Sequence, residues 1–585
     1  MKKLRINLLI ICSIFSLLFI TCQDFLEIPP PGAAAPDNMV SENGVNALLV
    51  GTYNRLLNLS RSAANYASDD IGNGGSNTSY GTFNGSGSVA GSWTTVYDAV
   101  QRANDVLRML EKTVDEGMIK PEKALQIEAE AKFLRGVFHL EAALWWRNVP
   151  YLDETNSFSD GTYFVSNTEP IWPKIEEDLK FAADNLTETK SEVGRANKWA
   201  AKSFLAKTYI FQLKFVEAKA LLVDIIANGK TSNGLKYALT EKYWDNFNTT
   251  GKHGPEAVFT VQNSVWVGNG NLGNPSYFRQ GTYNGPSAGC CGWAMPSEDL
   301  ADAHQVDDIT GLPLINGAYL QTGGIKRDWG VLSATAWTPH TGPVDSRLDW
   351  NMGRRGVPYL DWGVHPGRNW HRWPTVTCYS FIKNTAMQGG GNSEREVTNE
   401  GPRTANAYNM IRFADVLLWA AECEVEIGSL AQAEVYVNLV RARSANPVSW
   451  VYKYLDNSNP TGGYSTAPAA NYKVGLYAGQ FAANGKAYAR EAVRFERRIE
   501  FAGEYHRWFD LQRYNAMEPG YMGNTLNAMR LRRDVMVGPV ITYTPGWEFR
   551  IGINEIGEIP QSEIDLMESM AGHPVLIQNP GYEID

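Results

Sequence analysis

Long runs of apolar residues at helical spacing fill both ends of this chain and become rare in its middle. In the run Pro121–Trp146, Leu134, Val137 and Phe138 recur at spacings of three and four residues, and Pro150 follows the end. Such runs are too long for strands, so they predict a mostly α-helical protein. The predicted helices are Gln101–Glu111, Pro121–Trp146, Pro170–Leu186, Asn197–Ala227 with a bend near Lys214–Phe215, Arg412–Ile427, Leu430–Arg443 and Gly485–Asn515.

Two of these helical runs share the pattern of a tetratricopeptide repeat, in which small residues let paired helices pack closely. Ala206 and Ala218 lie twelve residues apart in Asn197–Ala227, and Ala421 and Ala433 repeat that interval in the helix pair of Phe413–Arg443. The two matches are far apart in the sequence. We therefore expect a helical scaffold with insertions and not a continuous solenoid.

The stretch from about Tyr243 to Thr404 has a different composition, rich in Gly, Pro, Asn and Trp. Short strands are predicted at Ala257–Val261 and Thr375–Ile382. Nine of the 18 tryptophans fall between Trp244 and Trp373. Disordered segments are poor in aromatic residues, so this long irregular stretch is predicted to be functional.

The tryptophans of this stretch are the best candidates for a binding site. A sugar ring has an apolar face of C–H groups and a rim of hydroxyls, which match flat aromatic rings and polar side chains respectively. For each single tryptophan, packing within the loops is an equally good interpretation, because large aromatic side chains are usually well buried. The predicted ligand-binding residues are Trp293, Trp329, Trp337, Trp362, Trp370 and Trp373, with Asp69, Asp70 and Asn73 from a second Gly-rich loop.

The N-terminus has the features of a lipoprotein signal peptide. A basic start, Lys2 to Arg5, precedes the apolar segment Ile6–Ile20, which is too short to span a bilayer comfortably. Cys22 stands where the cleavage site is expected, after Phe-Ile-Thr, and predicts a lipid-anchored mature protein that starts at this residue. The alternative is a plain secreted protein in which Cys22 is incidental.

Composition and motifs exclude several classes of function. The net charge of -10 argues against a protein that binds nucleic acid, which would need a basic face. The chain has no His-Glu-x-x-His or Cys-x-x-Cys motif, and we expect no cofactor, no metal and no catalytic residue. An acidic cluster allows a calcium site, although a solvated surface is the preferred interpretation because the spacing is not that of an EF-hand. Its members are Asp299, Asp302, Asp307 and Asp308.

The cysteines after Cys22 are too few for a disulfide scaffold at this length. Cys290 and Cys291 are adjacent and allow either a strained ring between them or a bond from one of them to Cys378. The sequence leaves this choice open. Cys423 lies in a helical run and is expected to be buried.

Three carboxylates in one helical run raise the alternative of a glycoside hydrolase. Glu496, Glu500 and Glu504 are spaced by four residues and therefore share a helix face. Glycosidase carboxylates must instead face each other across a substrate. Ion pairing with the neighbouring Arg497, Arg498 and Arg507 is the preferred interpretation.

Ordered blocks along nearly the whole mature chain resemble the SusD/RagB family of outer-membrane nutrient-binding lipoproteins. The most specific block is the run from Glu496 to Glu504, followed by Arg507 and Asp510-Leu511. Ser346 departs from the proline of the family's Asp-Pro-Arg block. The other matching blocks are Cys22–Glu27, Trp93 to Asn104, Glu130–Arg135, Val149–Tyr151, Gly194–Ala196, Asp345–Leu348 and Arg412–Leu418.

This resemblance implies a helical fold with four tetratricopeptide units that support a variable loop face. It implies a signal peptide at 1–21 and one SusD-like domain at 22–585, with an N-terminal helical part (22–240), a loop-rich ligand-binding part (241–405) and a C-terminal part (406–585). The implied function is non-enzymatic capture of oligosaccharides at the outer face of the outer membrane. The implied partner is a SusC-like TonB-dependent barrel. A peptide-capturing or purely structural lid of the same transporter type is the alternative.

Overall fold

The computed structural model describes residues 39–59, 67–71, 90–264, 285, 295–371, 378–383, 385–390, 395–398, 401–537 and 548–582. No helix in this part of the chain combines the length and the apolar character that a membrane crossing requires. Among the cysteines and the predicted ligand-binding residues, six lie outside the described ranges, namely Cys22, Asn73, Cys290, Cys291, Trp293 and Trp373.

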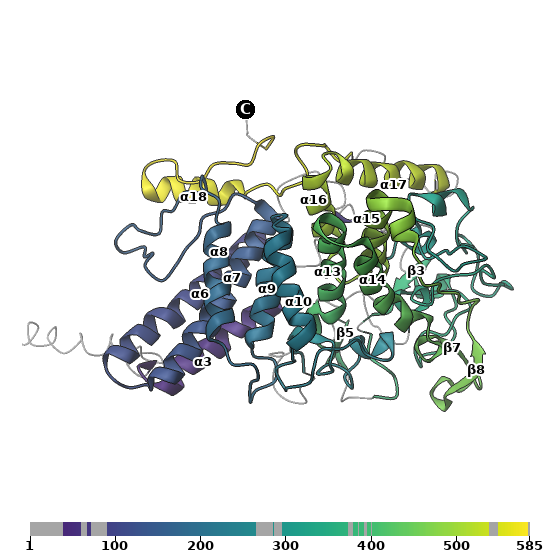
Figure 1. Ribbon diagram of the computed structural model, residues 1–585, viewed down its shortest axis with the longest axis horizontal. Coiled ribbons are helices and arrows are strands. Elements are labelled where there is room, and N and C mark those ends of the chain that lie inside the picture. The colour runs from purple at the N-terminus through teal and green to yellow at the C-terminus, as the bar shows by residue number, and fades with distance from the viewer. Residues whose placement is uncertain are drawn as a thin grey trace, which may run out of the picture.

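Helices dominate the structure (Figure 1), which confirms the mostly α-helical fold and the predicted helical segments other than Gly485–Asn515. The N-terminal set is α3 (Glu42–Asn54), η2 (Arg55–Asn58), α6 (Ala90–Asp115), α7 (Pro121–Trp146), α8 (Trp172–Asn185), α9 (Lys198–Phe211) and α10 (Phe215–Asn228). The C-terminal set is α13 (Phe413–Ile427), α14 (Leu430–Ala445), α15 (Gln480–Glu500), α16 (Arg507–Met517), α17 (Tyr521–Val537) and α18 (Gln561–Ala571).

Helix α7 shows why the sequence folds in this way. Every residue from Phe133 to Trp146 is buried, so this half of the helix is packed on all sides. Its polar residues therefore need partners: Arg135 donates two hydrogen bonds to Asp178 of α8, at 2.7 and 2.8 Å. His139 is fully buried as well, and its Nε2 accepts from the backbone N–H of Leu152.

The segment between α10 and α13 contains short helices and two-stranded ladders. Strand β1 pairs antiparallel with β6, so the beginning and the end of this segment lie side by side. Within the same segment β2 pairs with β3 and β4 pairs with β5, whereas the ladder of β7 with β8 follows α14. The strands are β1 (Ala257–Val261), β2 (Met352–Arg354), β3 (Tyr379–Phe381), β4 (Arg395–Thr398), β5 (Gly401–Thr404), β6 (Tyr408–Arg412), β7 (Tyr452–Tyr454) and β8 (Tyr464–Pro468). The short helices of this segment are η3 (Tyr243–Phe247), α11 (Glu298–Asp302), η5 (Ala318–Gln321), α12 (Leu348–Asn351) and η6 (Arg368–Trp370). Two more, η8 (Pro447–Ser449) and η9 (Pro460–Gly462), follow α14.

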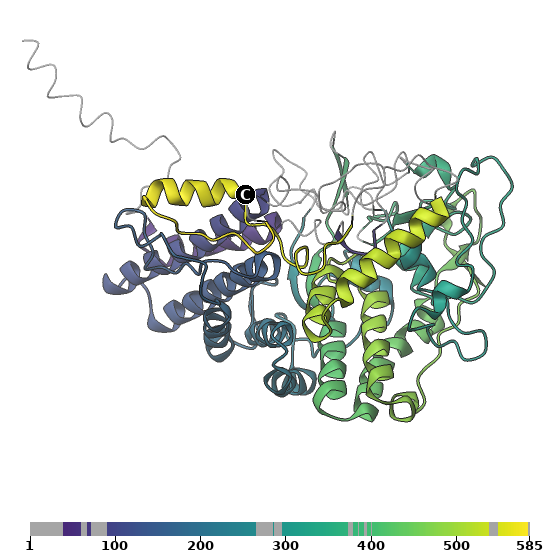
Figure 2. The same ribbon diagram turned by 90° about the horizontal axis from the view of Figure 1, so that it is seen from above.

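The two helical pairs with repeat-like sequences are neighbours in space. Helix α9 packs on α10, α10 packs on α13, and α13 packs on α14. The two pairs therefore form one row, α9 to α14, although the loop-rich segment separates them in the sequence (Figure 2). The two pairs are far apart in the sequence, as described above, but they are not separated in the fold.

The predicted helix Gly485–Asn515 is two helices, α15 and α16. Gly485 has a φ of 79°, which places a kink at the predicted start. Gly503, between the two helices, has a φ of 76°. A Cβ atom there would lie 2.6 Å from the ring of Phe381. Glycine is therefore required where the chain turns from α15 into α16.

Candidate functional site

Helix α15 and the turn after it carry three buried carboxylates. Glu496, Glu500 and Glu504 are at most 4% exposed. A substrate cannot reach groups that are closed to solvent to this degree. The alternative in which they form the carboxylate pair of a glycoside hydrolase is therefore wrong for these three residues.

The basic partners of these carboxylates come from segments far away in the sequence. All of them are buried, and they come from the loop-rich segment, from β6 and from α14. The ion pairs are Glu496 with Arg347 and Arg441, Glu500 with Arg347, Arg412 and Arg443, and Glu504 with Arg412 and Lys383. This ionic network therefore joins the loop-rich segment to the helical scaffold.

The neighbouring arginines, which the sequence favoured as partners, point elsewhere. Arg497 pairs with Asp415 and Asp510. Arg498 and Arg507 both pair with Asp69. The predicted ion pairing is correct for the block as a whole, but the predicted partners are wrong, because residues next to each other on a helix point in different directions.

Asp345 pairs with Arg347 of this network, and this pairing predicts that the protein loses stability in acid. Burial by itself raises the pKa of Asp345, but the guanidinium of Arg347, 2.8 Å away, outweighs it and lowers the pKa to about 2 from 3.8. The folded state thus binds this proton more weakly than the unfolded state, so the contribution of Asp345 is complete above pH 3.8 and is lost as the pH falls through about 2. The free energy of unfolding in urea should be measured at both ends of this pH range for the wild type and for Asp345→Asn. On acidification, the variant should lose about 2 kcal/mol less of this free energy than the wild type. Parallel pH profiles for the two proteins would contradict this assignment.

Arg498 and Arg507 fix the base of the loop that carries Asp69 and Asp70. Both oxygens of Asp69 accept from Arg507 at 2.8 Å, and Asp70 accepts from Arg498 at 2.9 Å. The two aspartates are 0% and 1% exposed. We therefore assign them a structural role in place of the ligand contact that the sequence predicted.

The same position joins a second chain segment. Ile71 forms an antiparallel bridge with Pro296, and Ser297 donates from its backbone N–H to the carbonyl of Asp70 and from its hydroxyl to the carbonyl of Asp69. The short segments 69–71 and 296–297 therefore lie side by side, and the arginines of α15 and α16 bind the first of them. Predicted ligand residues lie in the first segment and in the chain that continues from the second.

The acidic cluster divides into two parts. Asp307 is half-buried and Asp308 is exposed, which agrees with a solvated surface, but that interpretation is wrong for Asp299 and Asp302. Asp299 pairs with Arg498 and Arg532, and Asp302 pairs with Arg327 and Arg532. Both aspartates are buried. In the described part of the chain, no group of three or more His, Cys, Asp or Glu side chains has a geometry that suits a metal ion.

The two described cysteines after Cys22 are buried and have free thiols. Cys423, inside α13, agrees with the expectation of a packed apolar residue. Cys378 is free as well. Its predicted alternative partners, Cys290 and Cys291, lie outside the described residues.

Four of the predicted tryptophans lie in the described part, and three of them pack against apolar clusters. Trp362 and Trp370 contact the cluster around Tyr359, and the Trp362 indole N–H donates to the carbonyl of Ala386 at 2.9 Å. Trp329 packs against a second cluster, around Leu348 and Met352. These three rings contribute at least in part to loop packing.

Trp337 belongs to none of the apolar clusters of the described chain, although it is half-buried. The ammonium of Lys326 lies 4.4 Å from its ring centre and the guanidinium of Arg355 lies 5.5 Å away. Arg355 also donates to the carbonyls of Leu332 and Thr335 and so shapes the adjacent loop. Trp337 is thus an aromatic side chain held in place by cations and not by an apolar core.

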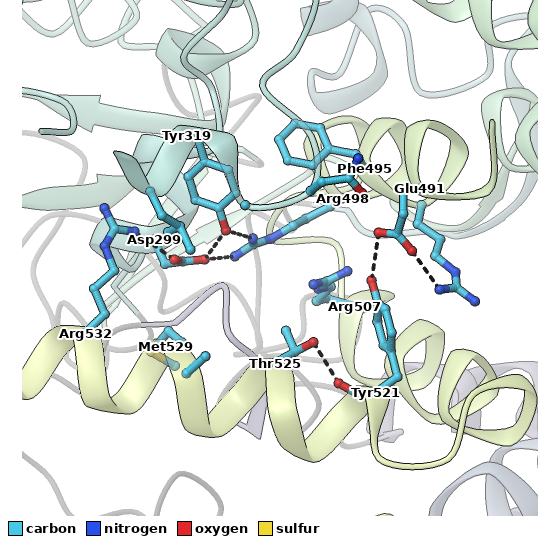
Figure 3. A pocket seen from close by; sticks show the side chains of 15 residues that line it. Asp299, Tyr319, Glu491, Phe495, Arg498, Arg507, Tyr521, Thr525, Met529 and Arg532 are labelled. Atoms are coloured by element: carbon cyan, nitrogen blue, oxygen red, sulfur yellow. Dashed lines mark hydrogen bonds and ion pairs between the residues drawn. The ribbon is translucent and has the colours of Figure 1, made fainter. Parts of the chain in front are cut away.

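A pocket between α15, α17 and η5 was not found from the sequence (Figure 3). It has a volume of about 270 Å³, and its walls include Arg498, Arg507, Tyr319, Phe495 and Tyr521. These residues are up to 202 positions apart, which is the distance from Tyr319 to Tyr521. No local motif could have pointed to them as a group.

Comparison with known proteins gives a consistent result. A model described as the SusD family matches residues 255–582, and one described as starch-binding associating with outer membrane matches residues 24–210. SusD-like protein P25 of Formosa agariphila is 23% identical over 543 residues, which cover 85% of this chain and 88% of that protein.

Solved structures agree over nearly the whole chain. A SusD superfamily protein from Bacteroides vulgatus has a TM-score of 0.62 and 19% identity, over 93% of this chain and 99% of that one. Surface glycan-binding protein A from Bacteroides thetaiotaomicron, in complex with laminarihexaose, has a TM-score of 0.59 and 17% identity, over 92% and 99%. At these identities the structures establish a common fold. The model of the SusD family matches more than half of the residues of this chain, and this chain therefore belongs to the SusD family.

Proposed function

We propose that this protein is a lipid-anchored outer-membrane lipoprotein that binds oligosaccharides at the cell exterior and delivers them to a SusC-like TonB-dependent transporter. The observation that carries the proposal is the likeness, over 92% of the chain, to a protein named for glycan binding and solved with laminarihexaose. Membership of the SusD family and the match to a starch-binding model at residues 24–210 support it.

The arrangement of the described residues suits capture without cleavage. The ionic network and the arginines of α15 and α16 hold the loop bases rigidly, and the tryptophans lie on the segment so held. A rigid scaffold lowers the entropic cost of ordering a binding surface. The carboxylates best placed by sequence to act as a catalytic pair are buried in ion pairs.

Isothermal titration of the mature protein against a panel of neutral glycans, starting with laminarihexaose, tests the proposal. We expect saturable binding of at least one glycan and unchanged ligand after long incubation. Hydrolysis of the bound glycan would favour a glycoside hydrolase. A complete lack of glycan binding would favour the peptide-capturing or structural lid.

The proposed lipid anchor separates binding from transport. Cys22→Ala is expected to leave glycan affinity unchanged, because the anchor lies outside the binding segments in the sequence. Uptake of the glycan by cells should fall, since the anchor keeps the protein near its transporter at a high effective concentration. Glycan uptake by cells that express the variant, measured with a matched protein level, checks this. Equal uptake would contradict the transport role of the anchor.

A further inference from the structure

The pocket of Figure 3 is bounded by elements other than those that carry the predicted tryptophans. Helix α15 provides Phe495 and Arg498, α17 provides Tyr521, and the η5 region provides Tyr319. Leu320, 36% exposed, and the exposed Ala528 stand at its edge, so the pocket opens to solvent. None of the described predicted tryptophans lines it.

The charged groups of the pocket are paired. Four guanidinium groups line it, and six carboxylates line it or lie directly behind them. The arginines are Arg494, Arg498, Arg507 and Arg532, and the carboxylates are Asp69, Asp70, Asp299, Asp302, Glu491 and Glu518. With so many carboxylates in contact with the arginines, the pocket offers no excess positive charge to an anion.

Paired charges still provide hydrogen bonds. Tyr319 donates to Asp299 at 3.0 Å and accepts from Arg498 at 3.2 Å, so one hydroxyl already bridges a carboxylate and a guanidinium. Tyr521 donates to Glu491 at 3.3 Å, a long bond that a closer hydroxyl could replace. Each carboxylate oxygen accepts more than one hydrogen bond, so a ligand hydroxyl can join these pairs without breaking them.

Apolar surface lies beside these polar groups. The rings of Tyr319, Phe495 and Tyr521 and the side chain of Met529 face the pocket. Aromatic faces next to donors and acceptors suit a neutral ring with one apolar face and several hydroxyls. A purely apolar ligand would leave the charged groups desolvated and without compensation.

The volume limits the ligand to a small one. About 270 Å³ lies just below the range of about 300 to 1,000 Å³ that is typical of sites for drug-sized ligands. We propose that this pocket is a second carbohydrate site, which takes a single neutral sugar unit, such as a terminal residue or side branch of the captured glycan. This inference rests on the proposed function and adds a site to it.

The pocket can be filled from α17 without touching its ion pairs. Ala528→Trp and, as a second variant, Thr525→Tyr place a ring in the pocket. Leu531→Trp places an indole ring at an exposed position of the same helix that does not line the pocket. Saturation-transfer NMR with D-glucose, D-galactose and D-mannose, with D-glucuronate as the acidic comparison, measures binding of single sugars. Thermal unfolding confirms that each variant is folded.

We expect the wild type and Leu531→Trp to bind at least one neutral sugar more tightly than glucuronate, and the two filling variants to bind it at least about tenfold more weakly. Unchanged binding by the filling variants, tighter binding of glucuronate, or no binding of any single sugar would overturn the inference. Oligosaccharide titration of the wild type is independent of this result. It alone decides the proposed function.

Discussion

Replacing Glu500 with glutamine is expected to lower the free energy of unfolding by about 3 to 5 kcal/mol, the range seen when one partner of a buried ion pair is removed. Glu500 is fully buried and accepts hydrogen bonds from Arg347 at 3.1 Å, Arg412 at 2.9 Å and Arg443. Burial raises the pKa of Glu500, but the three arginines outweigh it and hold the pKa well below its ordinary value. The carboxylate is therefore charged in the folded protein.

The glutamine is almost the same size, so the variant tests charge and not packing. The arginines keep some acceptors: Arg347 retains Asp345, and Arg412 and Arg443 retain Glu256. These remaining pairs are expected to keep the chain folded at room temperature, with a lower midpoint in urea.

Asp184→Asn is the matched control. Asp184 forms an ion pair with Lys180 on the surface of α8, at 2.6 Å, with both side chains more than half exposed. Exposed pairs contribute at most about 1 kcal/mol, so this variant should unfold almost as the wild type does. A loss below about 1 kcal/mol in Glu500→Gln would show that the network does not stabilise the fold.

The helices could be predicted from the sequence because their information is local. The pattern at Pro121–Trp146 gives α7 with the same bounds, and Ala257–Val261 gives β1. In both, the run of apolar residues along the chain is itself the signal for the element. The turn at Gly503 was missed because its cause is the ring of Phe381, which is 122 residues away in the chain.

The contacts that organise the site are not local, which is why they could not be predicted. The spacing of Glu496, Glu500 and Glu504 showed that they share a face, but nothing in it identified Arg412 or Arg443 as partners. Likewise, an aspartate in a Gly-rich stretch can lie at the exposed tip of a loop or at its buried base, and the local sequence does not distinguish the two. Asp69 and Asp70 were therefore taken for ligand residues, although they anchor the loop.

The ionic network also explains how a helical row can tolerate a long insertion. Glu256 precedes β1 at the start of the inserted segment, and Arg412 ends β6 at its other end. The two pair at 2.6 Å, beside the β1–β6 ladder. The insertion thus closes on itself, and α10 can pack on α13 whatever the loops between them contain.

Trp337→Ala is expected to weaken glycan binding at least about tenfold, a loss of about 1.4 kcal/mol. Of the four predicted tryptophans in the described chain, Trp337 is the one that packs against no apolar cluster, so its ring contributes least to the fold. The ammonium of Lys326, which is exposed beside the ring, provides a hydrogen-bond donor for the hydroxyls of a stacked sugar. Titration of the best glycan of the panel into the variant measures the change.

Two further variants separate stacking from stability. Trp337→Phe keeps an aromatic face and should retain part of the affinity. Trp172→Ala removes a half-buried tryptophan at the start of α8, outside the loop-rich segment, and should leave affinity unchanged. If Trp337→Ala binds the glycan as the wild type does, with the same unfolding temperature, this ring is not part of the binding surface. Weaker binding by both alanine variants, together with lower unfolding temperatures, would point to a general loss of stability.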